Sequence, residues 1–133
     1  RRFYLLGQTL DGMRVYDVVR SAKALRGIEG MKKVPLWMQA HGAMAANLLY
    51  ASLYVPEVTR LDLHDLPTSH IQGPAYLNVL RHLDLPQAVA LATERARVVL
   101  YQPEAKYDPF PAKVTEALGL GKKAFSVRKS MAK

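Results

Sequence analysis

The sequence predicts a single α/β domain, a three-layer αβα sandwich built on a mainly parallel sheet of about four strands. Short apolar segments alternate along the chain with longer segments of helical periodicity, which is the pattern of strands joined by helical crossovers. The length of 133 residues suits one domain, and a composition of 50% hydrophobic and 23% charged residues is sufficient for a buried core. No internal repeat or low-complexity tract interrupts the alternation.

The segment from Val34 to Tyr54 is predicted to form the centre of the fold. Residues 34–40 are mostly apolar, which favours a strand buried on both faces of the sheet. Residues 43–54 are apolar almost all round, which predicts a helix packed in the interior. Small residues around Gly42 permit a tight turn between the two. The aromatic residues of this segment are expected to pack in the core: Trp37, Tyr50 and Tyr54.

The remaining elements follow from periodicity, prolines and glycines. A helix capped by Thr9 or Asp11 and ended by Gly27 or Gly30 is predicted before the central strand. Alternation and β-branched runs predict further strands, while prolines mark the first turns of helices. The expected elements are strands at 59–64, 97–101 and 123–128, and helices at 75–83, at 86–95 and after Pro109 or Pro111.

Any functional site is expected at the carboxyl ends of the parallel strands, where ligands gather in such sheets. This rim is formed by four segments: His41–Gly42, 65–70, 102–108 and 126–129. The candidate catalytic residues on it are Asp108, Ser69, His70 and His41. Neighbours in a loop diverge, so Ser69 and His70 are poorly placed to act as nucleophile and base. Turn and cap hydrogen bonds are the competing interpretation.

The turn at residues 40–44 resembles the nucleophile elbow of α/β-hydrolases, whose pattern is small-x-nucleophile-x-small. Three segments are similar to the large acetyl xylan esterase and prolyl oligopeptidase-like hydrolases: Asp11-Gly-Met-Arg-Val-Tyr-Asp17, Gly42-Ala-Met-Ala-Ala46 and Asp65-Leu-Pro-Thr-Ser-His70. The resemblance covers residues 11–128. It implies a partial α/β-hydrolase fold, the carboxyl-terminal half of a larger hydrolase-like protein.

The resemblance also implies that the elbow is degenerate. It places Gly42, which has no attacking atom, at the nucleophile position, and Asp108 near the family's acid. No histidine follows His82 to supply the family's base. We therefore expect a noncatalytic domain, the structural or interface half of a larger hydrolase. Two alternatives stay open: an active serine ester hydrolase with a relocated triad of Ser69, Asp108 and a rim histidine, and a basic binding module for an acidic partner.

Charge and composition limit the partners. Nineteen Lys and Arg against eleven Asp and Glu give a net charge of +8, and the basic tail Lys122–Lys133 suits an acidic partner. The basic residues lack the aromatic interleaving of base-stacking surfaces, so nucleic acid is not favoured. We expect no metal or cofactor, since there is no cysteine and no HExxH pattern. We also expect no membrane partner, since no apolar run is long enough to span a bilayer.

The start at Arg1 is interpreted as a cut from a longer protein. The exposed sheet edge of the chain would then pair with an upstream catalytic domain or with a second copy of itself.

Overall fold

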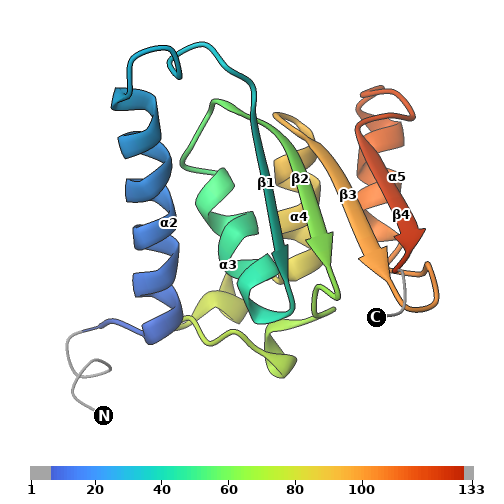
Figure 1. Cartoon of the computed structure of the whole chain (residues 1–133). Helices are drawn as coiled ribbons and strands as arrows, with labels where there is room; N and C mark the ends of the chain where they lie inside the picture. The colour runs from blue at the N-terminus through green and yellow to red at the C-terminus, as the bar shows by residue number, and fades with distance from the viewer. Residues whose placement is uncertain (1–6, 131–133) are drawn as a thin grey trace.

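Residues 7–130 are described by a computed structural model, and they form one parallel sheet with helices between its strands (Figure 1). The strands lie in the order β1 (Leu36–His41), β2 (Val58–His64), β3 (Arg97–Gln102) and β4 (Phe125–Lys129), each parallel to its neighbours. The α-helices are α2 (Leu10–Gly27), α3 (Ala43–Ser52), α4 (Leu85–Thr93) and α5 (Phe110–Ala117). Two short 3₁₀ helices, η1 (His70–Gln72) and η2 (Val79–Arg81), lie between β2 and α4. The α/β class with a four-stranded parallel sheet is confirmed.

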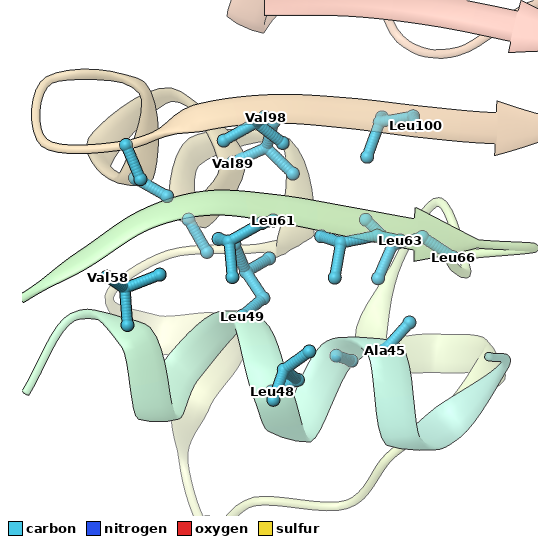
Figure 2. Close-up of a cluster of buried hydrophobic side chains, with 14 of the residues drawn as sticks. Ala45, Leu48, Leu49, Val58, Leu61, Leu63, Leu66, Val89, Val98 and Leu100 are labelled. Carbon is cyan, nitrogen blue, oxygen red and sulfur yellow. The ribbon is translucent and has the colours of Figure 1, made fainter. Parts of the chain in front are cut away.

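The helices cover one face of the sheet. Helix α2 packs on α3, α3 on α4 and α4 on α5, and Figure 1 shows α3, α4 and α5 behind the strands. The core lies between these layers, and Figure 2 shows part of it: Leu48 and Leu49 of α3, Leu61 and Leu63 of β2, Val89 of α4, Val98 and Leu100 of β3. Residues 7–130 thus supply the sheet and one helical layer.

Capping residues fix where the helices begin. The Thr9 hydroxyl accepts a hydrogen bond from the Gly12 amide at 2.9 Å, which confirms the predicted cap of α2. Asp84 and Gln87 form a reciprocal capping box at the start of α4, with Pro86 in its first turn. Helix α3 has no side-chain cap, and its buried surface holds it: seven of its ten residues are buried, so the predicted interior helix is confirmed.

Burial of β1 on both faces, predicted from its apolar run, is wrong. Its residues alternate between partly buried and exposed, and Trp37 is 64% exposed. The prediction that Trp37 and Tyr54 pack in the core is also wrong, since Tyr54, beyond the end of α3, is 67% exposed. Tyr50 does pack against the core. An apolar run in the sequence indicates a strand, but it does not show which faces of that strand are buried. Burial depends on the neighbouring elements that cover each face.

The predicted helix at residues 75–83 is also wrong. Only the single 3₁₀ turn of η2 forms there, because Asn78 adopts a left-handed conformation with φ 58° that interrupts any longer helix. Strand β4 begins two residues later than predicted, at Phe125, and it includes Lys129. The last residues of the basic tail, 131–133, lie outside the described part of the chain.

Candidate functional site

The carboxyl ends of β1, β2 and β3 meet in a stepped rim. His41 is in register with His64, and His64 with Tyr101. The residue that follows each strand then bonds to the next strand: the Gly42 amide donates to the His64 carbonyl at 2.8 Å, and the Asp65 amide donates to the Tyr101 carbonyl at 2.8 Å. These bonds fix the path of the chain as it leaves the sheet.

The turn from β1 into α3 passes through Gly42. Its backbone has φ 58° and ψ −131°, a region that costs other residues about 1–3 kcal/mol. A Cβ at this position would meet no atom within 4 Å, so backbone conformation alone favours glycine. The predicted tight strand-to-helix turn is confirmed. Its tip offers only backbone atoms, because glycine has no side chain.

His41 and Asp65 form a pair at this rim. The His41 Nε2 lies 2.5 Å from the Asp65 Oδ2, and the two side chains are 66% and 35% exposed. Sequence reasoning selected His41 but missed Asp65 as its partner. The signal was present, since His41 ends β1, Asp65 directly follows β2, and these two strands are adjacent and parallel. A carboxylate beside an imidazole orients its ring, as in the acid and base of a hydrolytic triad.

The Ser69 side chain serves as a helix cap. Its Oγ accepts from the Ile71 amide at 3.2 Å at the start of η1, and it donates to the Asp84 Oδ2 at 2.6 Å. Asp84 also accepts from the amides of His70 and Leu85, both at 2.8 Å. One carboxylate therefore joins the loop after β2 to the start of α4.

His70 lies in the interior, only 8% exposed. Its Nδ1 is 2.9 Å from the Pro74 carbonyl, which can only accept, so Nδ1 carries the proton. Nε2 then accepts from the Tyr50 hydroxyl at 2.7 Å. Burial, with a smaller effect of the Asp84 charge, raises the pKa of Tyr50 well above its ordinary value, which keeps the hydroxyl protonated as a donor. The rings of Tyr50 and Tyr76 pack edge-on around this bond.

Asp108 lies apart from the other candidates. Its Oδ1 accepts from the Phe110 amide at 2.8 Å, at the start of α5. The preceding residue, Tyr107, donates its hydroxyl to the Pro67 carbonyl at 3.0 Å and so ties this loop to the one after β2. Among the hydrogen bonds of residues 7–130, none joins any two of the four candidates.

The described residues contain neither a metal-binding cluster nor a membrane-spanning helix. Across residues 7–130, no three His, Cys, Asp or Glu side chains come close enough to hold a metal ion. In the same part of the chain, each helix is too short or too polar to cross a bilayer. No protein-family model, curated protein or solved structure matches this chain. The relationship to α/β-hydrolases therefore remains a prediction.

Replacing Gly42 tests the conformation of the turn. Gly42→Ala should lower the free energy of unfolding by about 1–3 kcal/mol, because alanine is strained at positive φ. The matched control is Gly27→Ala at the end of α2, where no positive φ occurs and alanine should stabilise by about 0.4–1 kcal/mol. Urea unfolding measures both. Equal effects of the two substitutions would contradict a turn whose backbone only glycine adopts without strain.

Acid should loosen the join between η1 and α4. Burial raises the pKa of Asp84, but hydrogen bonds from the Ser69 hydroxyl and the His70 and Leu85 amides outweigh it and hold the pKa below its usual value. The folded pKa lies below the unfolded value of about 3.9, so this carboxylate stabilises the fold above about pH 4 and its contribution is lost as the pH falls further. Urea unfolding between pH 7 and pH 3 should show a smaller acid-induced loss in Asp84→Asn than in the parent. Glu104→Gln, at an exposed site, should behave like the parent.

Proposed function

We propose that this chain is a degenerate α/β-hydrolase-like domain without acyl-transfer activity, which serves as the structural or interface half of a larger hydrolase. The observation that carries the proposal is Gly42 at the tip of the β1–α3 turn. The hydrolase pattern requires a nucleophilic side chain at that tip. Here the turn has a backbone conformation that glycine adopts without strain, and its tip has no side-chain atom that can attack a carbonyl.

The geometry of Ser69 supports the same proposal. A serine becomes a nucleophile when a base accepts its proton, and the acceptor here is the Asp84 carboxylate. The pKa of Asp84 is held below its usual value, which makes it a weak base at neutral pH. The same hydroxyl also caps η1. Ser69 thus has a structural role that explains its position.

The hydrogen bonds of His70 also argue against a catalytic role. A general base needs a ring nitrogen free to accept from its nucleophile. Both nitrogens of His70 are already used, one by the Pro74 carbonyl and the other by the Tyr50 hydroxyl. Recruiting His70 would break a buried hydrogen bond, at a cost of about 1–3 kcal/mol for the group left unpaired.

The edges of the sheet support an interface role. Strand β1 is at one edge, and none of the residues Leu36–His41 is a carboxylate, a lysine or an arginine. Strand β4 is at the other edge and carries the exposed cations Arg128 and Lys129, which discourage pairing. The unprotected edge of β1 therefore suits pairing with an upstream catalytic domain or with a second copy.

The His41–Asp65 pair favours one alternative, an active ester hydrolase. The exposed imidazole and its orienting carboxylate would supply base and acid on the rim. The nucleophile would have to come from Ser69 after it leaves Asp84, or from water. Asp108 would in that case keep its role at the start of α5.

Hydrolysis of an aryl acetate tests the proposed function. The purified chain should release the phenol from the aryl acetate no faster than buffer alone does, and Ser69→Ala should not change that rate. The same substitution should lower stability by about 0.5–2 kcal/mol, since it removes a cap. Turnover abolished by Ser69→Ala would refute the proposal. Turnover abolished by His41→Gln but retained in Ser69→Ala would favour the pair acting on water.

A further inference from the structure

The second face of the sheet has no helical layer within residues 7–130. We call it the open face, and we define it by the side chains that point away from the core. The register between strands places them in three rows: Trp37, Arg60 and Arg97; Gln39, Asp62, Val99 and Ser126; His41, His64, Tyr101 and Arg128. Sheets made only of parallel strands occur almost always with both faces covered.

Contacts within and between the rows hold the open face in one arrangement. The Arg60 guanidinium lies 4.7 Å above the Trp37 ring, and its NH2 is 3.0 Å from the Asp62 Oδ1. The His64 ring stacks on the Tyr101 ring, with centroids 4.4 Å apart and planes within 6°. These side chains have little freedom left to lose on binding, which favours association.

Unsatisfied groups mark the same face. Trp37 is mostly exposed although it is a large aromatic residue. The Arg97 Nε and the Ser126 Oγ are buried and have no hydrogen-bond partner among the described residues. A buried donor without an acceptor costs about 1–3 kcal/mol. Because both atoms are buried, a group supplied from outside residues 7–130 would reach the partly exposed Arg97 side chain and not these two atoms.

The charge of the open face indicates which chemical group a partner would supply to it. Its rows contain three arginines (Arg60, Arg97 and Arg128) and one carboxylate (Asp62), to which Arg60 is already paired. Arg97 and Arg128 remain as cations without an ion pair among the described residues. Carboxylates and phosphates both accept paired hydrogen bonds from a guanidinium, and of the two the carboxylate is the one that protein side chains supply.

We propose that the open face is the docking surface for an acidic amphipathic helix of a partner protein. Its apolar side would cover Trp37, and its carboxylates would meet Arg97 and Arg128. A helix is the layer that a parallel sheet ordinarily buries. Nucleic acid fits less well, because Arg60 occupies a face of Trp37, and the rings of His64 and Tyr101 cover each other, so few ring faces are left to stack bases. This inference rests on the proposed function and names the partner of the interface half.

Trp37 is the only tryptophan of the chain, so its fluorescence reports on the open face directly. The probe is a synthetic helical peptide with leucines on one side and glutamates flanking them. The control peptide has lysines in place of the glutamates. The acidic peptide should shift Trp37 emission to the blue, and its affinity should fall when salt is raised from about 0.1 to 0.5 M.

Charge-removing variants locate the contact. Arg97→Gln and Arg128→Gln together should weaken binding of the acidic peptide about tenfold or more. Arg20→Gln removes the same kind of charge from an exposed position on α2, on the helical side, and should leave binding unchanged. Equal weakening in Arg20→Gln would mean that net charge and not the open face attracts the peptide, and would overturn the proposal.

The remaining outcomes also decide the matter. Equal binding of the lysine peptide, or no emission shift with either peptide, would overturn the proposal. A shift with a single-stranded oligonucleotide in place of the acidic peptide would assign the face to nucleic acid. A shift that depends only on the concentration of the chain would assign it to a second copy. Aryl acetate turnover together with peptide binding would refute the proposed function and leave the docking surface intact.

Discussion

The backbone conformation of Gly42 is the constraint on which this structure depends. At φ 58° it turns the chain sharply from β1 into α3, and its amide bonds to the His64 carbonyl of the next strand. That bond sets the step between the carboxyl ends of β1 and β2. The step in turn brings His41 against Asp65. Glycine meets the constraint without strain, and any nucleophilic residue would have to pay for its presence with backbone strain.

Polar residues on the rim divide by their partners. Those in the loop between β2 and α4 are used up in holding that loop: Ser69 and the His70 amide bond to Asp84, and the His70 ring bonds to Tyr50. A network of this kind, in which a partly buried carboxylate and a buried imidazole both have partners, makes a segment rigid. His41 and Asp65 differ, since both are accessible and bond to each other. Residue types that suggest catalysis in a sequence thus acquire different roles from their hydrogen-bond partners.

The sequence predicted the parts of this structure that depend on local signals. Small residues around Gly42 predicted the turn, Thr9 predicted the cap of α2, and β-branched residues predicted β3. It did not predict which face of β1 would be covered, because that depends on neighbouring elements and not on the apolar run itself. The pairing of His41 with Asp65 required the register between two strands. The failed helix at 75–83 depended on one left-handed residue, Asn78, which helical periodicity cannot reveal.

The central claim is that the β1–α3 turn is a structural joint without a reacting group. The most direct measurement is the intact mass of the chain after incubation with a serine-directed fluorophosphonate. A serine activated as a nucleophile would form a covalent adduct, whereas one that is held as a cap would not. We expect the mass to remain that of the unmodified chain. A stoichiometric adduct on Ser69 or on any other serine would contradict the account.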